Sequence, residues 1–154
     1  MMQAPSPPAL LPHLRIATIA DAAGVAALLD ALGYPCNCED AGRRIALIEP
    51  DPRQRLIVAD HHGDCCGLVA LHARYSFAHD TDICHISALV VAPTYQQRGI
   101  GRQLLREAHV WARANGASRL EVASAAHRES AHAFYRHCGY PESGLRFVKW
   151  IGDA

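Results

Sequence analysis

The stretch of sequence best suited to chemistry is a polar, glycine-containing loop between an apolar run and an amphipathic segment. The apolar run includes Leu89, Val90 and Val91, and it ends at Pro93. The loop and the segment after it then read Gln96, Gln97, Arg98, Gly99, Ile100, Gly101 and Arg102. The N–H groups at a helix start, together with the helix dipole, bind anions, and glycine lets a phosphate approach the backbone closely. The pattern therefore predicts a phosphate site, to which the two arginines can add charge-assisted hydrogen bonds.

Two other kinds of phosphate-binding loop do not fit this stretch. A Walker A loop carries a lysine directly after its second glycine, and the chain has a single lysine, Lys149. A dinucleotide-binding fingerprint needs three glycines near the start of an alternating β/α unit, whereas this loop follows a predicted hairpin. Taken alone, Gly99 and Gly101 would also suit a tight turn from a strand into a helix, with no ligand at all.

The hydrophobic pattern predicts the elements that would hold this loop in place. Apolar runs bounded by turn residues indicate strands over 14–19, 56–59, 67–71, 82–92, 119–124 and 145–151. Helical spacing of apolar residues indicates helices from Thr18 to Leu32, over 39–48, from Ile100 to Asn115, and over 131–138. The order β-α-α-β-β-β-α-β-α-β is typical of a mixed α/β protein with one sheet and helices on its faces. The proline-rich residues 1–13 are predicted to form a disordered tail, and 14–154 a single domain.

The composition favours a protein without affinity for nucleic acid or membranes. The 154 residues carry a formal net charge of zero, so no overall field would draw the chain to a polyanion or an anionic bilayer. No apolar run is long enough to span a membrane, and residues 1–13 lack the apolar stretch of a signal peptide. The six cysteines and ten histidines do not follow the spacings of zinc ligands. We therefore expect a cytoplasmic protein with reduced cysteines and no metal.

Two motifs carry a resemblance to a known family. The spacing Gln96-x-x-Gly99-x-Gly101 resembles the [QR]-x-x-G-x-[GA] motif of the GNAT superfamily of N-acetyltransferases. The segment from Ala131 to Tyr140 is similar to the family's A-x-x-F-Y-x-x-x-G-[FY] signature. The predicted order of elements also matches, and the resemblance covers about 14–150. The C-terminal part resembles small bacterial members related to acetylators of aminoglycosides and other drug amines.

The resemblance implies that acetyl-CoA, as cosubstrate, lies where two parallel strands diverge at the centre of a splayed sheet. These strands would be 82–92 and 119–124. The pantetheine arm would pair with the backbone of the first strand, where an N–H of Val91 or its neighbour would polarise the thioester carbonyl, and the diphosphate would lie on the loop. The residues so implicated in cofactor binding are Leu89, Val90, Val91, Gln96, Gln97, Arg98, Gly99, Ile100, Gly101, Arg102, Ala131 and Phe134.

Tyr135 is the candidate catalytic acid. In the family, a tyrosine at this place often lies near the sulfur of CoA and protonates the departing thiolate, which lowers the energy of the developing charge. Tyr135 also falls on the apolar face of its predicted helix, so a packed tyrosine with a satisfied hydroxyl is the structural alternative.

The general base is less clearly indicated, because many relatives carry a glutamate near the place of Ser87. An amine is mostly protonated at neutral pH and must lose a proton before it attacks. His85 lies two residues earlier on the predicted strand, and imidazoles accept protons in this pH range. Glu121 on the neighbouring strand, or a water chain that ends on either residue, is an equal alternative.

A second departure from the family lies after strand 119–124, where relatives often have asparagine or glycine and this chain has Ala125 and Ala126. Alanine offers no side-chain hydrogen bond to the cofactor. These departures motivate one alternative function, a CoA-binding sensor or interaction protein with impaired catalysis. A second alternative is a nucleotide-phosphate-binding module without acyl chemistry.

The acceptor implied by the resemblance is a primary amine of a small molecule. No cysteine lies in a convincing nucleophile setting, so we expect direct attack by the amine in a ternary complex rather than an acyl-enzyme. Acidic side chains near the predicted acceptor pocket would suit a cationic amine, although charged loops are usually just solvated; they are Glu39, Asp40, Asp80 and Asp82. The protein is expected to be a monomer or a homodimer.

Overall fold

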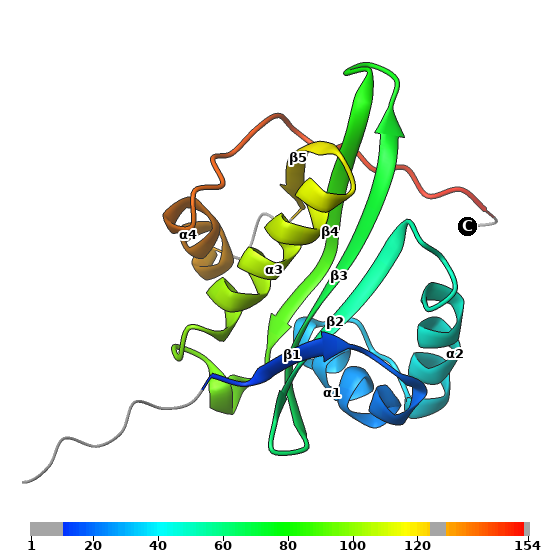
Figure 1. Ribbon diagram of the computed structural model, residues 1–154, viewed down its shortest axis with the longest axis vertical. Helices are drawn as coiled ribbons and strands as arrows, with labels where there is room; N and C mark the ends of the chain where they lie inside the picture. The colour runs from blue at the N-terminus through cyan, green and yellow to red at the C-terminus, as the bar shows by residue number, and fades with distance from the viewer. Residues whose placement is uncertain (1–10, 124–128, 153–154) are drawn as a thin grey trace, which may run out of the picture. The chain divides into compact units, whose positions relative to one another are not determined.

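A mixed five-stranded sheet forms the centre of the computed structural model, which describes residues 11–123 and 129–152. The chain divides into two compact units, 1–123 and 124–154. The elements of the first unit are β1 (His13–Ile16), the 3₁₀ turn η1 (Ile19–Asp21), α1 (Ala22–Leu32), α2 (Cys38–Ile48), β2 (Gln54–His61), β3 (Asp64–Ser76), β4 (Thr81–Val91), the 3₁₀ turn η2 (Pro93–Tyr95), α3 (Ile100–Ala114) and β5 (Ala117–Val122) (Figure 1).

The strands lie in the order β1-β2-β3-β4-β5. The first four pair antiparallel, and β5 joins the edge of β4 in parallel. A parallel neighbour requires a crossover connection, which α3 supplies between β4 and β5. The predicted mixed α/β class with a sheet flanked by helices is therefore confirmed.

One face of the sheet packs against α1 and α2. Val58 of β2, Leu68 of β3 and Val90 of β4 share a buried cluster with Val25 of α1 and Ile45 of α2. Side chains alternate along a strand, so every second residue of β2, β3 and the end of β4 belongs to this α1–α2 face. The cluster fixes the register of the strands that carry the candidate site.

The opposite face packs against α3, which contacts β3, β4 and β5 (Figure 1). A Cβ placed on Gly67 of β3 would lie 3.2 Å from a methyl carbon of Leu104 on α3. Val69 and Leu71 share this face with Gly67 by alternation, and both are buried. Ile100, the first residue of α3, is also buried, so the start of the helix is anchored to the sheet.

A partly buried ion pair connects β1 to the start of α1. Asp21 is 9% exposed, and its two carboxylate oxygens accept hydrogen bonds from Arg15 at 2.8 and 2.7 Å. The Thr18 N–H donates to the same carboxylate at 2.8 Å. These donors, the Arg15 guanidinium first, hold the pKa of Asp21 below its usual value.

We expect Asp21→Asn to lower the free energy of unfolding by about 2–3 kcal/mol at pH 7, because it leaves the Arg15 guanidinium without its main partner. Because the folded pKa of Asp21 is lowered, its contribution is present above the unfolded pKa of about 4 and is lost as the pH falls below it. Urea unfolding at pH 7 and pH 3 should show the difference between wild type and variant shrinking on acidification. Asp60→Asn, which removes the second partner of Arg15 at 3.1 Å, is the control with a smaller expected effect. An equal loss at both pH values would contradict a charge effect.

Several predicted boundaries differ from the structure because long-range pairing extends or shortens a strand. The strand predicted over 67–71 is β3 (Asp64–Ser76), since β4 pairs with it over nearly its whole length and the two form a long hairpin (Figure 1). The strand predicted over 14–19 ends at Ile16, because η1 begins at Ile19. The strand predicted over 119–124 is β5 (Ala117–Val122), and Ser124 lies outside the described residues.

The second unit contains α4 (Glu129–His137), which agrees with the helix predicted over 131–138. The predicted strand over 145–151 is wrong: these residues pair with no strand in the described parts of the chain. Their apolar side chains are exposed, with Phe147 at 88% and Trp150 at 91%. A strand forms only where a neighbouring strand pairs with its backbone N–H and C=O groups. An apolar pattern alone does not supply that neighbour. Across the described ranges, no helix has the length and apolar character needed to cross a bilayer.

Candidate active site

The candidate site begins where β4 and β5 stop pairing. Their parallel register runs from Asp82 opposite Ala117 to Ile86 opposite Val122, while β4 continues to Val91. Along this continuation, β4 has a partner only in β3 among the described residues. The backbone N–H and C=O groups on the other edge of 87–91 therefore face a gap in the described sheet. Apart from the Val91 carbonyl, which accepts a hydrogen bond from the Gln96 side chain, such groups need a partner from water or a ligand.

A β-bulge at Ser87 marks the same point of the sheet. Ala70 of β3 lies opposite Ala88, and the next residue, Leu71, lies opposite Ile86. Ser87 is thus the extra residue on β4, and its hydroxyl donates to the Ala70 carbonyl at 3.4 Å. A bulge increases the local twist of a strand, which suits the divergence of β4 from β5.

Beyond the gap, β4 leads into the predicted phosphate loop, whose conformation depends on two residues with positive φ. Gln97 has φ 62° and Gly99 has φ 83°, values that glycine adopts readily and a non-glycine residue adopts at a cost of about 1 kcal/mol. The side chain of Gln96 donates to the Val91 carbonyl at 3.2 Å and so ties the loop to the end of β4. The Gln96 side chain is therefore bonded to the protein backbone in this structure.

The start of α3 has the features of an anion site. Gly99 is the N-cap and has no side chain that could cap the helix. The first N–H groups of a helix have no acceptor within it, and here they follow an exposed loop, 96–99. The positive end of the α3 dipole lies at the same place, and Gly101 and Arg102, which follow Ile100, are half-buried. A diphosphate suits this combination of helix N–H groups without intrahelical acceptors, positive potential and absent side chain.

Tyr95 connects the loop to the turn between β2 and β3. Its hydroxyl donates to the Asp64 carboxylate at 3.2 Å, and the His61 ring lies edge-on to it with centroids 5.6 Å apart. The Arg98 guanidinium lies over the Tyr95 ring, 5.1 Å from its centroid. This arrangement orders the Arg98 side chain beside Gly99. The sequence had predicted the turn only as part of a hairpin, and no local pattern connects residues 61–64 with Tyr95.

The two candidate bases lie side by side at the mouth of the gap. His85 of β4 and Glu121 of β5 are register partners, directly before the last pair, and partners on neighbouring strands are about 4.8 Å apart. On the other side of His85 lies His72 of β3. His72 is an even number of residues from Leu68 on β3, so its side chain belongs to the same α1–α2 face. The side chains of His85 and Glu121, which lie next to it in register, belong to that face too. Arg119 approaches Glu121 at 3.4 Å, so this carboxylate is partly engaged. The sequence analysis missed His72, because only the strand register brings it beside His85.

The remaining predicted residues lie in the second unit. On α4, Ala131, Phe134 and Tyr135 are half-buried. The Tyr135 ring is 5.8 Å from that of Phe134 and 6.3 Å from that of Tyr140, centroid to centroid. Tyr135 also accepts a backbone hydrogen bond from the Tyr140 N–H at 2.9 Å. Their proposed contacts with the cofactor stay predictions, and Ala125 lies outside the described residues.

The described cysteines are free thiols, and three of them are poor nucleophiles. Burial raises the pKa of Cys65 and of Cys84 to about 11 and raises that of Cys66. A thiolate, not a thiol, is the attacking species. Among the described residues, no group of three or more potential ligands could hold a metal ion.

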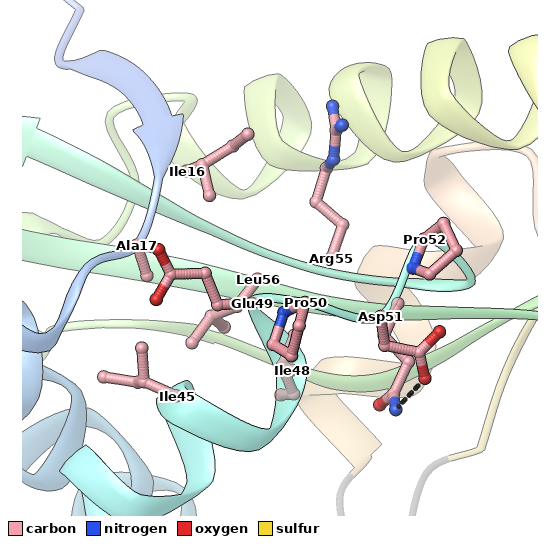
Figure 2. A pocket seen from close by; sticks show the side chains of 11 residues that line it. Ile16, Ala17, Ile45, Ile48, Glu49, Pro50, Asp51, Pro52, Arg55 and Leu56 are labelled. Carbon is pink, nitrogen blue, oxygen red and sulfur yellow. Dashed lines mark hydrogen bonds between the residues drawn. The ribbon is translucent and has the colours of Figure 1, made fainter.

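A hollow of about 300 Å³ lies elsewhere, between the end of α2, the end of β1 and the start of β2 (Figure 2). Its lining includes Ile45, Ile48 and Arg55, and Asp51 accepts a hydrogen bond from Gln54 at 2.9 Å. Because β1 and β2 line it, β3 separates it from the gap between β4 and β5. This hollow is therefore not part of the candidate active site.

Comparison with known proteins agrees with this geometry. The family described as acetyltransferase (GNAT) family matches residues 26–140, which include α3, β5, the phosphate loop and Tyr135. The chain therefore belongs to the GNAT acetyltransferase family, and the resemblance of its two motifs is confirmed.

Two similar proteins are named as N-acetyltransferases. The chain is 36% identical to an aminoalkylphosphonate N-acetyltransferase of Salmonella typhimurium over 67% of this chain and 66% of that enzyme, just under two thirds of its length. It is 30% identical to an aminoglycoside N(6′)-acetyltransferase type 1 of Stenotrophomonas maltophilia over 86% of this chain and 88% of that protein. Among solved structures, an aminoglycoside N-acetyltransferase, AAC(6′)-Iy, in complex with CoA shares the fold with a TM-score of 0.79 at 14% identity, over 93% of this chain and 97% of that one.

Proposed function

We propose that this chain transfers the acetyl group of acetyl-CoA to a primary amine of a small molecule by direct attack in a ternary complex. The observation that carries the proposal is the edge of β4 over 87–91 that no described strand pairs with, followed along the chain by the loop 96–99 and the first N–H groups of α3. The edge suits an extended, amide-containing arm, and the helix start suits a diphosphate. Coenzyme A has both parts, joined in this order.

The residues present fit this cosubstrate. Gly99 to Arg102 would hold the diphosphate, Arg98 would add a charge held in place by Tyr95, and the backbone of Leu89 to Val91 would pair with the pantetheine arm. A backbone N–H at the end of β4 would stabilise negative charge on the thioester oxygen. The relative solved with CoA has the same fold, which supports the assignment of the cosubstrate.

The chemistry needs two proton transfers. The amine nitrogen forms a bond to the acetyl carbon while the C–S bond breaks, so one proton leaves nitrogen and one is taken up by the thiolate. We assign the first to His85 or to its register partner Glu121, which lie side by side at the mouth of the gap. We assign the second to Tyr135. A covalent intermediate on Cys65 or Cys84 is disfavoured, because burial raises the pKa of both thiols.

A ligand series tests the proposal. Acetyl-CoA and CoA at about 100 times their Kd are expected to raise the Tm by roughly 5–10 °C, since a ligand stabilises the state that binds it. ATP and NAD are the controls and should raise it less. Thiol release from acetyl-CoA with a panel of primary amines then measures transfer.

The alternatives give different results. Greater stabilisation by ATP or NAD than by CoA would favour a nucleotide-binding module. Stabilisation by acetyl-CoA without thiol release for any amine would favour a CoA-binding sensor or interaction protein.

A further inference from the structure

The sheet face beside the mouth of the gap carries a basic side chain that the mechanism does not use. Arg74 of β3 lies two residues beyond His72, so it has the same parity and belongs to the α1–α2 face. Both side chains are exposed. Within the described ranges, Arg74 makes no ion pair or side-chain hydrogen bond, unlike Arg15, Arg53 and Arg119.

Two carboxylates near these side chains are already engaged by other groups. Glu121 is paired with Arg119 at 3.4 Å. Asp51, whose charge reaches His72, accepts hydrogen bonds from the Gln54 side chain and the Arg53 N–H, both at 2.9 Å. The group left with a positive charge and no partner beside the two histidines is the Arg74 guanidinium.

Two of the acids expected to attract a cationic amine are engaged by other groups, whereas Glu39 is exposed at the start of α2 and Asp40 lies 3.7 Å from Arg43. Asp80 accepts a hydrogen bond from the Tyr75 hydroxyl at 2.7 Å, and Asp82 pairs with Arg53 at 3.2 Å. Asp82 belongs to the opposite face, since it is an odd number of residues from His85 on the regular part of β4. Asp80 and Asp82 therefore do not supply an acidic pocket on this face, and Glu39 and Asp40 are the predicted acids that lie on an element packed against it.

We propose that the acceptor is an amine that also carries an anionic group, a phosphonate, phosphate or carboxylate, and that Arg74 and His72 bind this group. The inference rests on the proposed function and adds the class of acceptor. The spacing is suitable: His72 is one strand away from His85, about 4.8 Å, and Arg74 is about 7 Å further along β3. An amine held near His85 would thus have its anionic group within reach of the Arg74 guanidinium. A guanidinium forms bidentate hydrogen bonds with phosphonate, phosphate and carboxylate groups.

The test compares acceptors that differ in the anionic group. Wild-type protein is assayed with acetyl-CoA and 2-aminoethylphosphonate, β-alanine, propylamine or kanamycin. We expect kcat/KM to be highest for an anion-bearing amine. Arg74→Gln should lower kcat/KM for that amine by about 10- to 100-fold, mainly through KM, and leave propylamine within about twofold. Arg74→Lys should restore part of the loss. Arg106→Gln, at an exposed position on α3, is the matched control and should change neither.

The possible outcomes separate this inference from the function on which it rests. Equal kcat/KM for charged and uncharged amines, or the same proportional loss for all amines in Arg74→Gln, would overturn the anionic acceptor while leaving N-acetyl transfer in place. Preference for kanamycin would overturn it in favour of a polycationic acceptor. Stabilisation by acetyl-CoA with no turnover of any amine would overturn both proposals.

Discussion

Gly101→Glu is expected to weaken CoA binding at least about 100-fold while leaving the protein folded. Gly101 is the second residue of α3, so the new carboxylate would stand among the amides proposed to bind the diphosphate. Repulsion between charges about 4 Å apart amounts to roughly 4 kcal/mol at a partly exposed site, which exceeds the 2.8 kcal/mol or so that corresponds to a 100-fold change.

The same substitution should not destabilise the free protein. Glutamate is a better helix former than glycine and is favourable in the first turn of a helix. Isothermal titration calorimetry with CoA, with the Tm measured in parallel, separates the two effects. His109→Glu adds the same charge at an exposed position on the same helix, about 12 Å further along its axis, and should leave affinity nearly unchanged. An unaltered Kd for Gly101→Glu would remove the phosphate site from the start of α3.

The second large effect is expected at Tyr135. Tyr135→Phe removes one hydroxyl and keeps the ring contacts with Phe134 and Tyr140. If Tyr135 protonates the departing thiolate, kcat should fall about 100-fold with little change in CoA affinity. Steady-state thiol release and calorimetry provide the two measurements.

Tyr140→Phe is the control for the second unit, because it removes a hydroxyl from the neighbouring ring. It should leave kcat within a few fold. A kcat for Tyr135→Phe equal to that of wild type would take this residue out of the mechanism and leave thiolate protonation to water. A loss of equal size in both variants would indicate an effect on packing instead.

Much of the fold follows from local patterns. The helix over 39–48 was predictable because Ile45 and Ile48 recur at helical spacing and prolines follow; in the structure the helix begins at Cys38, one residue earlier, with Asn37 capping it through a 2.8 Å hydrogen bond from the Asp40 N–H. The apolar pattern misled at 145–151, since an alternating or apolar run becomes a strand only when a neighbouring strand pairs with it. That partner is a property of the whole chain and not of the segment.

The candidate site, like the fold, could be predicted in part from local sequence patterns. The glycine spacing at 99 and 101 indicated the anion site, since it reflects local backbone geometry. The contact between Tyr95 and Asp64 joins residues 31 positions apart, and the position of His72 beside His85 depends on the register of the β3–β4 hairpin. Neither has a local signal, because both arise from strand pairing.

Because Ser87 is an extra residue, the alternation of side chains between the two faces of the sheet shifts by one position along β4. Before it, Ile86 lies opposite Leu71, on the side covered by α3, whereas after it Val90 lies opposite Leu68, against α1. Deleting Ser87 would leave Ile86 opposite Leu71 and Ala88 opposite Ala70, so the other side chains of β4 would keep their faces and the strand would lose only the bulge and the local twist that accompanies it. A shorter β4 should thus keep its core and lose the geometry of the gap, which makes the bulge a feature of the site and not of the core.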